Sequence, residues 1–562
     1  MQKILEIVKV YVKEILLITY IISNYTIYID RISSFGFSLN LVIYLILFIS
    51  LFLAILFFSY LKNNLSRYII AVIFVISAII IDSYHRIMGD FLTYNAFISL
   101  LNAKGFVGEA FIQFNKEIVQ SVVAALILGL GIAVKPRNVN INGYIQISYP
   151  VITILAFTLL LFYRGGDGSK GLPTVFTPIF YSNLYAYEAL NESVGDRKDI
   201  TIQQNDENIP YDIILIIDES VSGNYLDINT AKGVYTALQK DYNNINIYNY
   251  GYAASITNCS AEVNHTLKYG GTRNDYIRIN STMPSIWKYA RHAGLRTIYI
   301  DAQRTGGHLH NNMSEDELND IDEFIQFDDT PVRYRDMQAA DKLAVYINNN
   351  HAEFIILNKI GAHFPVHDKF PDEFTHYKPI LPRGNFINVS DVPPHSYFNN
   401  AANMWDRYRN SYKNTLLWNV GNFFEKLLSK SNLNNAVVIY TSDHGQDLHE
   451  RGNPGKKTHC SSNPYQEEGV VPLLILEGAQ SNILNWNKNI AANKNKTSHY
   501  NIFPTLLLLM KYDLNSILNT YGTPLNEVTN DNLTFNTRFH SRLGKKPVWI
   551  KINPDEMLVP DE

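Results

Sequence analysis

Acidic side chains follow two apolar runs that have the composition of buried strands. Residues 213–217 read IILII and lead into Asp218-Glu219-Ser220, and residues 436–440 read AVVIY and lead into Thr441-Ser442-Asp443-His444-Gly445. Because the carboxyl ends of parallel strands meet at one edge of a sheet, these side chains are expected to lie close together. Taken alone, the acidic residues after the first run are equally typical of a solvated loop that follows a core strand. Together, their carboxylates and imidazole suit zinc and predict a metal-centred active site.

Small polar residues lie between the two acid-bearing runs along the chain. Residues 255–262 read SITNCSAE and are expected to open a helix. A hydroxyl at a helix start is most often an N-cap, but beside a metal ion it loses its proton more readily and becomes a nucleophile. We choose Ser260 as the nucleophile. Thr257 and Cys259 remain alternatives, because the sequence does not show which side chain points into the site.

Two histidines are expected at the same edge of the sheet. His363 follows an apolar run that ends near Leu357, and His459 follows a Gly/Pro-rich turn that can fold it back toward Asp443. His449, in the same loop as His459, is the alternative, and His367 is expected on the surface.

Composition narrows the class of protein. The chain has 562 residues, a net charge of -4 and two cysteines, Cys259 and Cys460. Its length requires at least two domains, and its charge gives no electrostatic case for nucleic acid as a partner. Two cysteines are too few for a disulfide-rich scaffold or a Cys-rich zinc module.

Apolar runs in the first third of the chain predict five membrane spans, at residues 15–29, 41–61, 65–81, 119–134 and 145–163. Lysines and arginines in the short loops place the N-terminus in the cytoplasm, so five spans carry the remainder outward. We therefore expect an α-helical membrane domain over residues 1–164 and a linker along the membrane surface over 165–209. Alternating strand-like and helical stretches in residues 210–562 predict a soluble α/β domain with a mainly parallel sheet.

These motifs together resemble one known family. The chain is similar to the phosphoethanolamine transferases of the bacterial inner membrane, in the alkaline phosphatase and sulfatase superfamily. The likeness rests first on Ser442-Asp443-His444-Gly445, then on Asp218-Glu219-Ser220 and Ala362-His363-Phe364-Pro365. Residues 408–415 and 498–505 add weaker support, and the order of spans, linker and α/β domain agrees.

The resemblance implies a reaction and a place for it in the cell. It implies transfer of phosphoethanolamine from phosphatidylethanolamine to a glycolipid acceptor, lipid A or the lipopolysaccharide core, with the catalytic domain in the periplasm. A catalytic zinc ion would be held by Glu219, Asp443, His444 and the Ser260 hydroxyl, and a second zinc, if there are two, by His363 and His459. His363 and His459 would bind the transferred phosphate group, and one of them would protonate the leaving oxygen.

The outer segment between the third and fourth spans could form the entry surface for the donor lipid. Asn102 and Glu109 are then expected to contact the ethanolamine head group. The alternative is that this segment merely links two spans.

The chain departs from the family pattern in three ways. The family nucleophile is a threonine followed, three places on, by a serine, whereas Val263 stands three places after Ser260. Asp218 replaces the usual glycine, and we assign it no metal. The usual run of disulfides is missing, but Cys259 adjoins Ser260 and Cys460 adjoins His459, so one disulfide in the oxidising periplasm is an alternative to two free thiols.

Three other functions remain. A membrane-bound phosphatase or sulfatase would use the same scaffold, although a sulfatase needs a modifiable residue followed by a Pro and Arg pattern that residues 259–262 lack. A phosphoglycerol transferase would share both the spans and the site. A scaffold protein with a degenerate domain is disfavoured by the retained metal-ligand pattern.

Overall fold

The chain forms two compact units in the computed structural model. One holds the first eight helices together with Ser541–Lys545, and the other holds all the strands described. The structure describes residues 2–88, 91–102, 107–139, 141–166, 174–191, 196–205, 207–349, 351–383, 404–452, 457–461 and 463–558.

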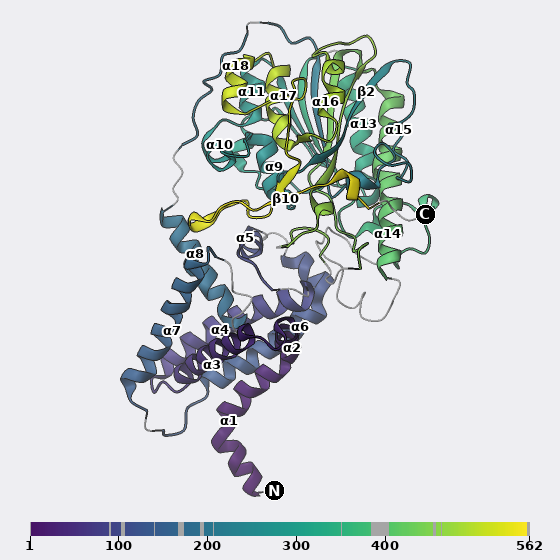
Figure 1. The fold of residues 1–562 in the computed structure, drawn as a ribbon. Helices are drawn as coiled ribbons and strands as arrows, with labels where there is room; N and C mark the ends of the chain where they lie inside the picture. Colours follow the sequence, from purple (N-terminus) through teal and green to yellow (C-terminus); the bar gives the residue numbers. More distant parts are fainter. Residues whose placement is uncertain are drawn as a thin grey trace. The chain divides into compact units, whose positions relative to one another are not determined.

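Helices make up the described part of the first unit (Figure 1). They are α1 (Gln2–Ser23), α2 (Tyr25–Phe35), α3 (Leu39–Ser59), α4 (Asn64–Met88), α5 (Tyr94–Asn102), α6 (Val107–Ala133), α7 (Gly143–Tyr163) and α8 (Thr177–Asn191). Among the described residues, four helical segments are long and apolar enough to cross a membrane. A fifth is reached if the pair α1 and α2, bent by 65°, counts as one span. The predicted helical membrane domain is confirmed in this form.

Two buried basic side chains donate hydrogen bonds to carbonyl oxygens at the C-terminal end of α6. Lys13 Nζ donates to the carbonyl oxygens of Gly131 and Ile132 at 2.8 and 3.0 Å, and Arg67 Nε donates to that of Ala133 at 3.4 Å. Positive charge at a helix C-terminus satisfies carbonyls that have no partner within the helix and complements the helix dipole. Both basic residues therefore stabilise the packing of α6 against α1 and α4.

The segment expected to be a linker is partly helical. Helix α8 packs Phe180, Tyr181 and Leu184 into the core of the first unit, together with Val175 and Phe176 of the preceding 3₁₀ turn (Thr174–Phe176). The first compact unit thus extends beyond residue 164, and placement along a membrane surface stays a prediction for the remainder of residues 165–209.

The second unit is built on an eight-stranded sheet in the order β4-β3-β5-β1-β6-β7-β2-β8. Its strands are β1 (Asp212–Asp218), β2 (Ile245–Ala254), β3 (Arg296–Asp301), β4 (Glu323–Ile325), β5 (Glu353–Asn358), β6 (Ala436–Ser442), β7 (Val470–Gly478) and β8 (Thr497–Ser498). Strands β4, β3, β5, β1 and β6 are parallel, and β7 runs antiparallel to both its neighbours. A separate antiparallel pair is formed by β9 (Thr534–Asn536) and β10 (Trp549–Lys551). The predicted mainly parallel α/β domain is confirmed.

Helices cover both faces of the large sheet (Figure 1). One layer contains α9 (Ser260–Tyr269), α10 (Tyr276–Thr282), α11 (Ile286–His292), α17 (Ile502–Leu509) and α18 (Leu514–Thr520); the other contains α13 (Arg335–Ile347), α14 (Met404–Leu416) and α15 (Phe423–Lys430). The short helices α12 (Glu315–Leu318) and α16 (Ile490–Asn493) complete the set. Side chains of a strand alternate between faces, so Ile213, Leu215 and Ile217 of β1 join the core on the α9 side. This double cover explains why the central strands read as unbroken apolar runs.

Candidate metal centre at the sheet edge

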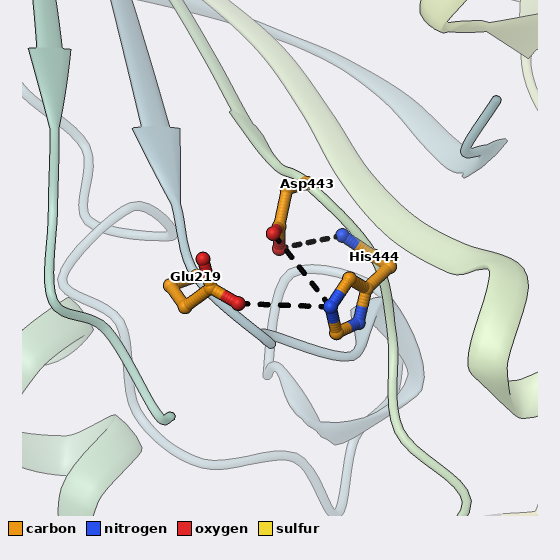
Figure 2. Close-up of side chains that lie close together, drawn as sticks. All are labelled: Glu219, Asp443 and His444. Atoms are coloured by element: carbon orange, nitrogen blue, oxygen red, sulfur yellow. Dashed lines mark hydrogen bonds and ion pairs between the residues drawn. The ribbon is translucent and has the colours of Figure 1, made fainter. Parts of the chain in front are cut away.

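The ends of β1 and β6 bring together three side chains that could bind a metal ion (Figure 2). The strands pair in register, with Asp218 opposite Ser442, so the residues that follow them are neighbours. Potential ligand atoms of Glu219, Asp443 and His444 all lie within 4.8 Å of one another, and the three side chains are buried. His444 Nε2 is 3.6 Å from both Glu219 Oε1 and Asp443 Oδ2. This is the juxtaposition that the strand-end pattern predicts.

The cluster has the properties of a cation site. Burial, and then the neighbouring Asp443 carboxylate, raises the pKa of Glu219 to about 7, and burial also raises that of Asp443. Asp443 Oδ2 is buried and accepts no hydrogen bond from the residues the structure describes. His444 Nδ1 lies 2.8 Å from the Gly445 carbonyl, an orientation typical of metal-binding histidines that leaves Nε2 toward the acids. Two buried carboxylates with an imidazole therefore fit a divalent ion.

Ser260 is the first residue of α9, and its hydroxyl points into the cluster. Its Oγ donates to Glu219 Oε1 at 2.8 Å and lies 3.1 Å from His444 Nε2. The N-cap position belongs to Cys259 instead, so Ser260 does not cap the helix. Thr257 Oγ1 turns to Asn258 at 3.4 Å, and Cys259 is disulfide-bonded. Of the three nucleophile candidates, Ser260 alone has its side chain in contact with the acids.

The two predicted histidines lie beside this cluster. The ring of His459 stacks on that of His444 with centroids 4.6 Å apart, and His363 lies 6.0 Å from His459 by the same measure. Both are almost fully buried. His363 Nδ1 is 2.8 Å from the Phe364 carbonyl, and His459 Nδ1 is 3.1 Å from Thr458 Oγ1. Side chains from five separate stretches of the chain thus meet at one place, at residues 219, 260, 363, 443–444 and 459.

The remaining predicted contacts, Asn102 and Glu109, belong to the helical unit. The backbone of Asn102 ends α5 and that of Glu109 lies in the first turn of α6, both in the helical unit. Their side chains lie outside the described part of the structure.

Gln303 belongs to the centre although the sequence reading missed it. Its Nε2 donates to Glu219 Oε2 at 3.0 Å and to the Lys359 carbonyl at 2.9 Å, so it fixes the second oxygen of the Glu219 carboxylate. Gln303 follows β3, whose carboxyl end lies at the same edge of the sheet as those of β1 and β6. The strand-end rule, applied to this strand as well, would have found it.

A disulfide joins the two loops that supply Ser260 and His459. Cys259 and Cys460 are bonded, and the Cys460 amide donates to the Asn258 carbonyl at 2.9 Å. Of the two arrangements considered from the sequence, paired and free, the structure has the pair. Since each cysteine adjoins a residue of the cluster, the bond restrains the separation of Ser260 and His459.

Replacing Cys259 and Cys460 together by serine should therefore lower both stability and activity. A disulfide of this kind contributes ~2–4 kcal/mol to the free energy of unfolding. We expect a lower melting temperature and a catalytic rate reduced by about tenfold, because loss of a contact that supports an active site typically lowers its activity by that factor. Thermal unfolding and rate assays measure both. A wild-type protein whose rate is unchanged after both thiols have been reduced and labelled would contradict this role.

The fold and the cluster define an α/β domain with a candidate metal centre at the carboxyl edge of its sheet. A family model described as Sulfatase matches residues 212–512. That match covers more than half of the sequence, and the chain belongs to the sulfatase family.

Solved structures extend the likeness to the helical unit. The integral membrane protein lipooligosaccharide phosphoethanolamine transferase A (EptA) from Neisseria meningitidis has a TM-score of 0.63 at 16% identity, over 89% of this chain and 95% of that one. The C-terminal periplasmic domain of EcEptC from Escherichia coli has a TM-score of 0.49 at 17% identity, over 62% and 95%. No curated protein sequence matches the chain. The likeness to EptA shows a shared fold.

Proposed function

We propose that this protein transfers phosphoethanolamine from phosphatidylethanolamine to a glycolipid of the cell envelope, lipid A or the lipopolysaccharide core. The observation that carries the proposal is the Ser260 hydroxyl, 2.8 Å from Glu219 and 3.1 Å from His444, with two further imidazoles beside it. A buried hydroxyl among acids and imidazoles is the arrangement of an activated nucleophile. The name of EptA and its fold support the choice of transferred group.

In the first step, Ser260 Oγ attacks the phosphorus of the donor lipid. The bond from Oγ to phosphorus forms, and the bond from phosphorus to the glycerol oxygen breaks. Diacylglycerol leaves with that oxygen, which takes a proton from His363 or His459. The proton of the Ser260 hydroxyl has Glu219 Oε1 as its acceptor at 2.8 Å. Proton transfer by a positioned imidazole contributes ~100-fold to 10,000-fold to a rate.

In the second step, an acceptor hydroxyl or phosphate oxygen attacks the phosphorus of phosphoserine 260. The bond from phosphorus to Ser260 Oγ breaks, and the serine oxygen takes back the proton that Glu219 accepted in the first step. The histidine that protonated the first leaving group is now able to take the proton of an acceptor hydroxyl. Donor and acceptor therefore bind in turn, and the kinetics should be ping-pong.

Glu219, Asp443 and His444, with the Ser260 hydroxyl, would hold a catalytic zinc ion. When bound, zinc lowers the pKa of a coordinated hydroxyl and neutralises negative charge on phosphoryl oxygens. The buried Asp443 Oδ2, which accepts no hydrogen bond from the described residues, supports this assignment. His363 and His459 would contact the transferred phosphate and are the residues that would hold a second ion.

The proposed donor and acceptor support a location in the bacterial inner membrane with the catalytic domain in the periplasm. Both proposed substrates are lipids, so a multi-pass anchor keeps the site at the surface where they lie. A disulfide is stable in that oxidising compartment, which supports the location. Asn102 and Glu109 remain the proposed contacts to the ethanolamine head group.

The competing reactions differ in the acceptor of the transferred group or in the group that is transferred. A hydrolase would pass it to water, and a phosphoglycerol transferase would carry a different head group. Sulfate-ester hydrolysis through a modified cysteine is disfavoured, because Cys259 is engaged in the disulfide.

Mass analysis of surface glycolipids tests the proposal. Cells that carry the gene, compared with cells that lack it and with cells that carry the Ser260→Ala variant, should gain one phosphoethanolamine group on a glycolipid. A gain of phosphoglycerol would favour the second reaction. Glycolipids of identical mass in all three strains would overturn transfer to a glycolipid.

A further inference from the structure

Three buried charged side chains meet next to the candidate metal centre, where Asp218 directly precedes Glu219. Lys359 Nζ is 2.7 Å from Asp218 Oδ2 and 3.9 Å from Asp336 Oδ2, and all three side chains are fully buried. The Tyr440 hydroxyl also donates to Asp218 Oδ2, at 2.9 Å. Two carboxylates thus share one ammonium group in an interior shielded from water. This charge network comprises Asp218, Lys359 and Asp336, and none of the three contacts the Ser260 hydroxyl.

The charge network is attached to both loops that supply the centre. Asp218 directly precedes Glu219, and its carbonyl accepts the Asp443 amide at 2.9 Å. On the other side, Asp336 accepts the amides of Ile360 and Gly361 at 2.8 and 3.1 Å. These amides begin the turn that leads to His363. Asp218 is therefore fixed to the Glu219 loop and Asp336 to the His363 loop. Lys359 connects the two carboxylates.

Gly361 shows how closely the two loops approach. Its φ of +52° is in the region that favours glycine, and a Cβ there would lie 2.4 Å from the Glu219 carbonyl oxygen and 2.7 Å from Asp218 Oδ1. The next amide, that of Ala362, donates to the same Glu219 carbonyl at 2.9 Å. A shift of either loop would thus be transmitted directly to the other.

A π-helical turn completes the attachment. Residues Leu417–Asn422 form a π-helix between α14 and α15, a feature often found at functional sites. Within it, the Asn419 carbonyl accepts Lys359 Nζ at 2.5 Å, and Asn419 Nδ2 donates to the Gly361 carbonyl at 2.6 Å. Asn419 therefore forms hydrogen bonds with both the Lys359 ammonium group and the His363 loop.

We propose that Asp218, Lys359 and Asp336 are positioning residues that set the separation of Glu219 and His363. A buried ion pair contributes little net stability, because removing its charges from water costs about as much as their attraction returns. Its directional contacts do fix geometry, and here they link the strand end that carries Glu219 to the turn that carries His363. The measurement of kcat described below rests on the proposed function, whereas the measurement of Zn²⁺ affinity does not.

Asp218→Asn is the variant that tests the charge network. It keeps the shape of the side chain and leaves Lys359 balanced by Asp336. Glu317→Gln is the matched control, because it removes one carboxylate charge from another buried pair, Lys268–Glu317, at 2.9 Å. We expect kcat of Asp218→Asn to fall ~10-fold to 100-fold, with KM for phosphatidylethanolamine within about twofold of wild type. Glu317→Gln should change neither. Equal kcat values in the two variants would overturn the proposal.

A second variant and a metal titration separate this inference from the proposed function. Asp336→Asn weakens the hold on the His363 loop and removes one of the two carboxylates that face Lys359, so it should lower kcat as well, even if Asp218→Asn fails to fold. If wild type shows no transfer, the proposed function fails and Zn²⁺ binding decides the inference. Competition with a chelator should then give a dissociation constant ~10-fold higher for Asp218→Asn than for Glu317→Gln. Equal constants would overturn the positioning role.

Discussion

Replacing Ser260 by alanine should lower the transfer rate by at least ~1,000-fold, the size of loss expected when a catalytic nucleophile is removed. The hydroxyl that would form the bond to phosphorus is removed, while the acids and imidazoles around it remain. Release of diacylglycerol and modification of the acceptor should both stop, because the two steps share one intermediate. Radiolabelled phosphatidylethanolamine, followed into both products, measures each step.

Thr257→Val supplies the matched control for this variant. Thr257 is three residues earlier on the same loop, and its hydroxyl turns to Asn258 at 3.4 Å rather than to the acids. Its loss should leave the rate within a few-fold of wild type. If Thr257→Val were inactive and Ser260→Ala active, the assignment of the nucleophile would be wrong, although the family would stand.

Replacing His444 by alanine should abolish both zinc retention and transfer. His444 supplies the one nitrogen in a group whose other members are carboxylates, and its Nε2 lies within 3.6 Å of both acids. We expect the zinc content of purified protein to fall to background and the rate to fall by ~1,000-fold or more, about 4 kcal/mol of transition-state stabilisation. Elemental analysis together with the labelled-lipid assay measures the two effects.

His351→Ala is the control for removing a histidine side chain away from the site, since His351 is exposed and lies in the same unit. It should retain zinc and full activity. Wild-type protein stripped by a chelator should lose activity and regain it when Zn²⁺ is restored, whereas His444→Ala should not respond. An active His444→Ala variant without bound zinc would refute a metal-dependent site.

Strand ends could be predicted from the sequence because burial imposes a simple pattern. Ile213 to Ile217 is apolar throughout since helices cover both faces of the sheet, and the run stops where the backbone reaches the polar edge. The same reasoning brought together Glu219, Asp443 and His444. The same pattern could have predicted Gln303, which follows β3.

Other features depend on tertiary contacts that no local pattern reports. The bond between Cys259 and Cys460 spans 201 residues, so spacing alone could not distinguish it from two free thiols. Helix α8 lacks an amphipathic period because Phe180 is buried while Tyr185 and Leu190 are exposed, and all three are apolar. Lys359 pairs with Asp218 across neighbouring strands, a contact that appears only once the sheet order is known.

The intermediate on Ser260 offers the most direct test of the proposed reaction. Zinc-loaded full-length protein would be incubated with phosphatidylethanolamine in the absence of an acceptor, quenched in acid, digested and analysed by mass spectrometry. The peptide that contains Ser260 should gain the mass of one phosphoethanolamine group, with the modification on that serine. Diacylglycerol release with an unmodified Ser260, or with the group on another residue, would contradict the account.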